Sequence, residues 1–152
     1  DIRACFLTHS HLDHAGGCHA LKERGIALYA HEIAADAIAA GDERCCGFLY
    51  HKPFIPCEAD VRLKDGDVVT VCGVAIEALH LPGHTMGCTA FRLNADGREV
   101  VVSGDVIGTL LSGYFGWNGS FDRQESIPEF PRPLREIQPG RHAPGPRPHL
   151  LW

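Results

Sequence analysis

Four side chains that can bind a metal ion lie within six consecutive residues near the start of the chain. They are His9, His11, Asp13 and His14 in the segment THSHLDH, which directly follows an apolar run at residues 2–7. In a chain of 152 residues with 10 histidines, the pattern HxHxDH is expected by chance only about 0.003 times, so a surface cluster of histidines is the weaker explanation. The segment therefore predicts a metal site.

The spacing of these residues has a physical reason. On an extended segment, side chains two residues apart point the same way, so His9 and His11 can bind one cation together. The sequence Ala-Gly-Gly at residues 15–17 permits a tight turn into a helix, which directs Asp13 and His14 toward a second position nearby. Imidazole and carboxylate ligands suit Zn²⁺ and also Fe²⁺. Because the cluster contains no thiolate, we expect a catalytic rather than a closed structural site.

Two later segments add candidate ligands. His84 lies in a Gly/Pro turn, LPGHT, directly after a predicted strand, and Asp105 follows the apolar run at residues 100–102 in the segment SGD. Each signal is weak alone, since turn histidines are often just exposed and Asp commonly ends strands. Active sites gather at strand ends and loops, so we expect both side chains to join the first cluster.

In this order, THSHLDHAGG, LPGHT and SGD resemble the metallo-β-lactamase superfamily, and the resemblance extends from residue 2 to about residue 142. The DGD at residues 65–67 and the β segment before LPGHT also fit. The resemblance implies an α+β fold, an αββα sandwich with the site at one edge of the two sheets. It implies a first metal bound by three histidines and a second bound by Asp13 and His14, with Asp105 bridging both. The three histidines are His9, His11 and His84.

The last ligand of that family is a histidine in a C-terminal PGHG turn. Here the text is PGRH, so Arg141 occupies the expected place and His142 follows one residue later. We expect His142 to complete the second metal site, with His149 as the weaker substitute.

The sequence pattern predicts one domain over residues 1–152 that begins with alternating strands and helices. Residues 42–60 are expected to be a loop, followed by antiparallel hairpins with turn signals at 64–67 and 94–97. The segment 122–137 holds three prolines, which a regular helix does not accommodate. The predicted strands are 2–7, 26–30, 68–72, 74–79, 89–93 and 99–102, and the predicted helices are 17–24, ended by Gly25, and 32–40, ended by Gly41.

Members of the family usually have further strands before the first motif, which are absent from this sequence. We therefore expect an N-terminally truncated member whose first sheet has an exposed edge.

Composition narrows the range of partners. A net charge of −5 with scattered Lys and Arg argues against nucleic-acid binding. No apolar run approaches the roughly 20 residues of a membrane helix. The seven cysteines are odd in number and lack zinc-ribbon spacing, which predicts reduced thiols in a cytoplasmic protein. Cys18 is either a buried core residue or a pocket residue, and His31 and His80, at strand ends, are either packing residues or neighbours of the ligands.

Together with the metal cluster, the resemblance implies a binuclear zinc hydrolase, with Fe²⁺ or Mn²⁺ as possible replacements for Zn²⁺. A two-metal-activated hydroxide would cleave an ester, thioester or lactam/lactone carbonyl of a small molecule, with Asp13 orienting it and taking its proton. Aromatic residues after Asp105 are expected either to line the substrate pocket or to pack: Tyr114, Phe115 and Trp117. One alternative is a mononuclear iron oxidoreductase of the persulfide-dioxygenase type using His11, His84 and Asp105. The other is an inactive remnant of the fold.

Overall fold

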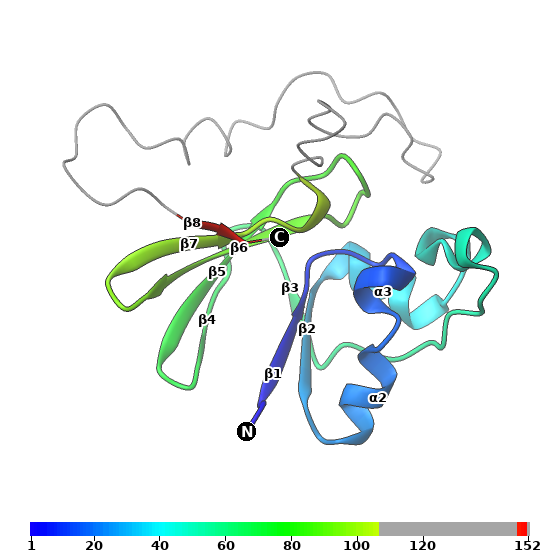
Figure 1. Cartoon of the computed structure of the whole chain (residues 1–152), viewed down its shortest axis with the longest axis horizontal. Coiled ribbons are helices and arrows are strands. Elements are labelled where there is room, and N and C mark those ends of the chain that lie inside the picture. The colour runs from blue at the N-terminus through cyan, green and yellow to red at the C-terminus, as the bar shows by residue number, and fades with distance from the viewer. Residues whose placement is uncertain (107–148, 152) are drawn as a thin grey trace.

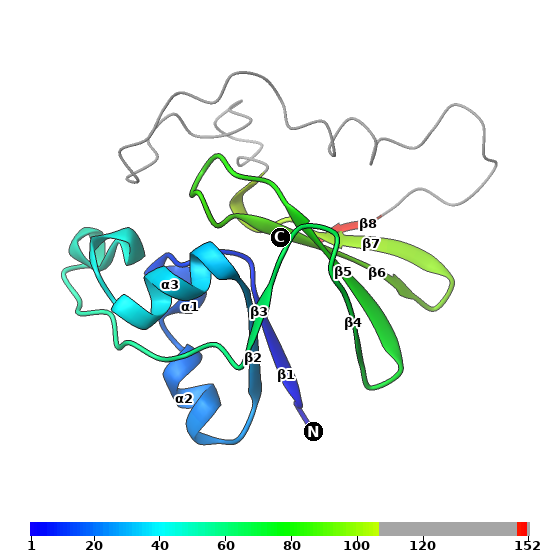
Figure 2. The same ribbon diagram turned by 180° about the vertical axis from the view of Figure 1, so that it is seen from behind.

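Two β-sheets face each other, and helices cover the outer face of the first sheet (Figures 1 and 2). The computed structural model describes residues 1–106 and 149–151. The first sheet is parallel, in the order β1-β2-β3, with bounds Ala4–Leu7, Ala27–His31 and Val61–Leu63. The second sheet follows the order β4-β5-β6-β7-β8 and is antiparallel except for β8, which runs parallel to β7. Its strands are β4 (Val68–Val71), β5 (Val74–His80), β6 (Thr89–Ala95), β7 (Arg98–Val102) and β8 (His149–Leu151).

Three helices connect the strands of the first sheet, as the parallel order requires. They are α1 (Leu12–Ala15), α2 (Cys18–Glu23) and α3 (Glu32–Ala40). The predicted stop signals hold: Gly25 has a φ of +75°, and Gly41, at +60°, donates its N–H to the Ala37 carbonyl. Both conformations are left-handed and favour glycine.

Successive side chains of the first sheet point to opposite faces and so contribute to two hydrophobic cores, one under the helices and one between the sheets. In β1 and β2, Leu7, Leu28 and Ala30 pack against the helices, whereas Phe6 and Tyr29 face the second sheet. There Phe6 stacks on Tyr29 with ring centroids 4.5 Å apart and meets the edge of Phe91 at 5.2 Å. These aromatic contacts hold the two sheets together.

The αββα expectation is confirmed, and the described residues supply three of its four layers. One prediction was wrong: the turn at residues 64–67 does not close a hairpin but carries the chain from β3 in the first sheet to β4 in the second. The hairpin turn lies instead at Cys72 and Gly73, between β4 and β5. The Pro-containing segment 122–137 lies outside the described residues.

The sequence pattern did not predict the shortest elements. Strand β3 has three residues and α1 has four, too few to show a period. The segment 42–60, expected as a loop, contains two 3₁₀ turns, η1 (Glu43–Cys45) and η2 (Gly47–Tyr50). A third, η3 (Gly104–Val106), follows β7.

Two further expectations concern the described part of the chain. All seven cysteines lie within it, and no disulfide joins them there. None of its helices has the length and apolar character needed to cross a bilayer.

Phe91 tests the packing between the sheets, because it is 3% exposed and meets Phe6 edge to face. We expect Phe91→Leu to lower the free energy of unfolding by about 1–2 kcal/mol through lost volume and ring contact. Denaturant unfolding measures this change. Val68→Ala is the control, since Val68 is 61% exposed and its truncation should have little effect. Equal stability of Phe91→Leu and the wild type would contradict this packing.

Candidate metal centre

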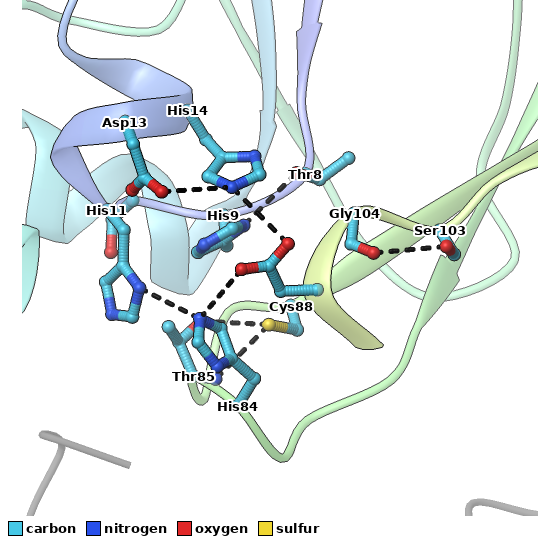
Figure 3. A network of polar contacts seen from close by, with 12 residues as sticks. Thr8, His9, His11, Asp13, His14, His84, Thr85, Cys88, Ser103 and Gly104 are labelled. Carbon is cyan, nitrogen blue, oxygen red and sulfur yellow. Dashed lines mark hydrogen bonds and ion pairs between the residues drawn. The ribbon is translucent and has the colours of Figure 1, made fainter. Parts of the chain in front are cut away.

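The predicted ligands come from three segments that end at the same edge of the molecule. The HSHLDH motif follows β1, His84 lies in the loop of residues 81–88 between β5 and β6, and Asp105 lies in η3 after β7. Figure 3 shows the rings of His9, His11, His14 and His84 turned toward one another. The structure thus unites residues that are more than 90 positions apart in the sequence.

Three buried imidazoles form the first donor set. His9 is 0% exposed and His11 6%, and the His84 side chain is 10% exposed. Their ring centroids lie 4.6–4.9 Å apart, and His84 Nε2 is 2.9 Å from His11 Nδ1. One nitrogen from each ring lies within 4.8 Å of the others, so these three residues can hold a metal ion. Three protein ligands with an open fourth position are typical of catalytic zinc.

A second donor set shares a residue with the first. His9, His14 and Asp105 also place donor atoms within 4.8 Å of one another. One Asp105 oxygen lies 3.4 Å from His14 Nε2, and the other lies 3.6 Å from His84 Nε2. The carboxylate therefore stands between the two sets, where a bridging ligand is expected.

The converging donor sets differ from the predicted ligand groups in two respects. Asp13 Oδ2 is 3.6 Å from His14 Nε2, but Asp13 belongs to neither converging set within the described residues. His9, predicted for the first set alone, belongs to both. His142 and the aromatic residues Tyr114, Phe115 and Trp117 lie outside the described residues.

Close backbone approaches bring the segments together. A Cβ on Gly104 would lie 2.6 Å from Thr8 Oγ1, so only glycine lets the turn before Asp105 reach the end of β1. The Thr89 N–H at the start of β6 donates to the Thr8 carbonyl at 2.9 Å. The N–H groups of His14 and Ala15 donate to the His11 carbonyl, which starts α1 inside the motif.

The electrostatics favour a neutral His9 and a charged Asp105 carboxylate. Burial, followed by the neighbouring rings of His14, His11 and His84, lowers the pKa of His9 to about 2. A hydrogen bond to Asp105 raises the pKa of His14 against the effect of burial. The same bond is the main cause that lowers the pKa of Asp105 to about 2.

These residues fit a zinc ion. His9 Nε2 is fully buried and has no hydrogen-bond partner among the described residues. A buried polar atom without a partner is unfavourable by about 1–3 kcal/mol, and coordination to a cation would satisfy it. The donor set of imidazole and carboxylate is one that zinc accepts.

Residues 48–50 were not singled out by the sequence pattern. Phe48 and Leu49 are exposed, and so is Tyr50. Burial and then the nearby Asp13 carboxylate raise the pKa of Tyr50, which places its hydroxyl beside the motif. No spacing rule marks this segment, because its approach to Asp13 depends on the fold of residues 42–60.

Cys18 is a core residue. It packs among the side chains between the first sheet and the helices, and burial raises the pKa of its thiol to about 12. Of the two readings left open by the sequence, the structure supports ordinary packing.

The sequence model of the metallo-β-lactamase superfamily matches residues 1–147. The chain belongs to this superfamily. A hydroxyacylglutathione hydrolase of Pseudomonas entomophila is 33% identical over 106 residues, which cover 70% of this chain and 34% of that protein. A protein of Aquifex aeolicus is 36% identical over 102 residues, 66% of this chain and 46% of that one. The chain therefore spans less than half the length of these superfamily members.

Solved structures of metallo-β-lactamases are also similar to this chain. A metallo-β-lactamase of Cronobacter sakazakii with a HARLDQ motif has a TM-score of 0.60 at 33% identity, covering 68% of this chain and 40% of that one. A subclass B3 metallo-β-lactamase of Bradyrhizobium japonicum has a TM-score of 0.60 at 32% identity, covering 80% and 49%. The superfamily motif of the present chain reads HSHLDH, so His11 and His14 stand where HARLDQ has Arg and Gln.

The buried His9 makes the metal-free protein sensitive to acid. The folded chain holds His9 neutral, whereas the unfolded chain protonates it below its ordinary pKa of 6.5. The stabilisation is therefore present above pH 6.5 and is lost as the pH falls. The pKa of His14 is raised above 6.5, so His14 changes the free energy of unfolding with pH only above pH 6.5.

In the wild type, the free energy of unfolding should fall as the pH is lowered from about 6.5 to about 5. We expect His9→Gln to reduce the slope of this fall by about 1 kcal/mol per pH unit. Denaturant unfolding of chelator-treated protein at several pH values measures the slope. The control is His51→Asn, a change at an exposed histidine, which should keep the wild-type slope. Parallel slopes for His9→Gln and the wild type would contradict a buried neutral His9.

Proposed function

We propose that this protein is a binuclear zinc hydrolase that cleaves an ester, thioester or lactam/lactone carbonyl of a small molecule. The observation that carries the proposal is the convergence of two donor sets that share His9, with the Asp105 carboxylate between His14 and His84. A single-metal site would leave one of these sets unused.

Each residue has a proposed role. His9, His11 and His84 hold the first metal, and Asp13, His14 and His142 hold the second, with Asp105 ionised between them. Zinc ions in such a site supply a nucleophile from water near neutral pH and polarise a carbonyl oxygen. Asp13 is the proposed proton acceptor, because its half-exposed carboxylate lies 3.6 Å from His14 and beside Tyr50 at the surface of the site.

Two observations support the proposed substrate class, the names of the relatives and the side chains near Asp13. The similar proteins include a hydroxyacylglutathione hydrolase and metallo-β-lactamases, and both reactions attack a carbonyl carbon. Tyr50 lies beside Asp13 and shares a 3₁₀ turn with the exposed Phe48 and Leu49, which favours a substrate with an apolar part. The seven cysteines, odd in number and without zinc-ribbon spacing, suit the reducing cytoplasm, where we propose that the protein acts.

Metal content separates this proposal from its rivals. We expect about two zinc ions per chain in protein purified without chelator, as in other two-metal sites, falling toward one in His142→Ala. Elemental analysis of the folded protein gives the ratio. One iron per chain would favour the oxidoreductase, and folded protein that cannot bind metal would favour an inactive remnant.

Asp13 offers a test of the chemistry. We expect Asp13→Asn to lower kcat by about 10²- to 10⁴-fold, because the amide cannot accept the proton. Hydrolysis of a thioester, a lactone and a β-lactam by zinc-loaded protein measures the effect. Asp96→Asn is the matched control, since Asp96 lies in the exposed turn between β6 and β7. A kcat unchanged by Asp13→Asn would remove the proposed role of this carboxylate.

A further inference from the structure

Two histidines outside the donor sets stack on each other across the two halves of the fold. His31 ends β2 and begins α3, whereas His80 ends β5. Their ring centroids are 3.9 Å apart and their planes are inclined by 10°. His31 is 4% exposed and His80 is partly buried. The stack therefore joins the helical side of the first sheet to a strand end of the second.

The ring nitrogens of the pair have defined partners. His80 Nε2 donates to the Met86 carbonyl at 2.8 Å, and Met86 lies two residues after His84. The backbone N–H of His80 donates to Asp65 at 2.8 Å. His31 Nδ1 accepts from the Ile33 N–H at 3.3 Å and so caps α3.

The hydrogen bonds define the protonation of one nitrogen in each ring. The Ile33 N–H needs an unprotonated His31 Nδ1, and the Met86 carbonyl needs a proton on His80 Nε2. Burial and the His80 ring lower the pKa of His31, opposed by the carboxylates of Glu32, Asp65 and Asp67.

The loop that carries His84 lies directly on the start of α3. A Cβ on Gly87 would be 2.6 Å from the Ala34 nitrogen and 2.8 Å from the Ala34 Cβ. Within the loop, the Leu81 N–H donates to the Cys88 carbonyl and the Thr85 N–H to Cys88 Sγ. Because these hydrogen bonds tie the loop internally, its contact with α3 supports the position of His84.

The first donor set needs such a contact. His9 and His11 follow a strand of the first sheet, whereas His84 follows a strand of the second. A small shift between the sheets would separate His84 from the other two rings. Groups that orient metal ligands without touching the metal typically change affinity by about 10- to 100-fold.

We propose that His80, backed by the ring of His31, is a positioning residue for His84 that holds the 81–88 loop on α3 and so sets the geometry of the first metal position. This inference rests on the proposed metal centre and extends it to two residues outside it.

Paired variants separate the hydrogen bond from the stack. His80→Phe keeps a flat ring against His31 but loses the donor to Met86, whereas His80→Gln keeps an N–H donor and loses the ring. We expect His80→Phe to weaken zinc binding at the tighter position by about tenfold or more, and His80→Gln to lie closer to the wild type. Competition of the metal-free protein with a chromophoric chelator measures affinity, and the visible spectrum of bound Co²⁺ reports ligand geometry. His51→Asn is the exposed control.

The outcomes distinguish this inference from the proposed function. Failure of the wild type to bind zinc would overturn both. Wild-type binding with an unchanged affinity in His80→Phe would overturn this inference alone. Equal losses in His80→Phe and His80→Gln, with an equally lowered thermal midpoint of the metal-free protein, would show a merely structural role and would also overturn it.

His31→Asn provides a second variant should His80→Phe not fold. Asn retains an oxygen acceptor for the Ile33 N–H and removes the ring behind His80. We expect its affinity for zinc to fall by a smaller factor than in His80→Phe, comparable to that in His80→Gln, because the hydrogen bond from His80 to Met86 remains. An affinity equal to that of the wild type would contradict the role assigned to the stack.

Discussion

The structure depends on the burial of several imidazoles around one carboxylate at the edge of two sheets. His9 is fully buried with an Nε2 that lacks a partner among the described residues, and its own neighbours oppose its protonation. Apolar side chains would fill such a position more favourably if it were only part of the core. The arrangement is therefore best explained by a cation that the rings and the Asp105 carboxylate can share.

The two-sheet fold is what brings these groups together. The first sheet presents the motif after β1, and the second presents His84 and Asp105 at the ends of β5 and β7. Two glycines allow the contact between the halves: Gly104 approaches Thr8, and Gly87 approaches Ala34. Gly104 packs on the Thr8 side chain and Gly87 on the backbone of Ala34, so tight turns at strand ends bring the segments of the site together.

The sequence alone predicted the parts that have strong local signals. The HSHLDH motif pointed to side chains that converge with His84 and Asp105 in the structure, and the period of residues 32–40 with Gly41 predicted α3 with the observed bounds. Local signals did not reveal that His9 belongs to both donor sets, since that depends on how α1 turns His14 back toward Asp105. The 64–67 turn was misread as a hairpin because a turn signal does not say which sheet the next strand joins. The position of Tyr50 beside Asp13 and the stacking of His31 on His80 depend on tertiary packing, which residue spacing in the sequence does not reveal.

The most direct test of the account is anomalous diffraction at the zinc absorption edge from crystals of the zinc-loaded protein. The account predicts two peaks about 3.5–4 Å apart, one reached by His9, His11 and His84 and the other by His14, with Asp105 between them. A single peak, or peaks only away from these side chains, would contradict a binuclear site.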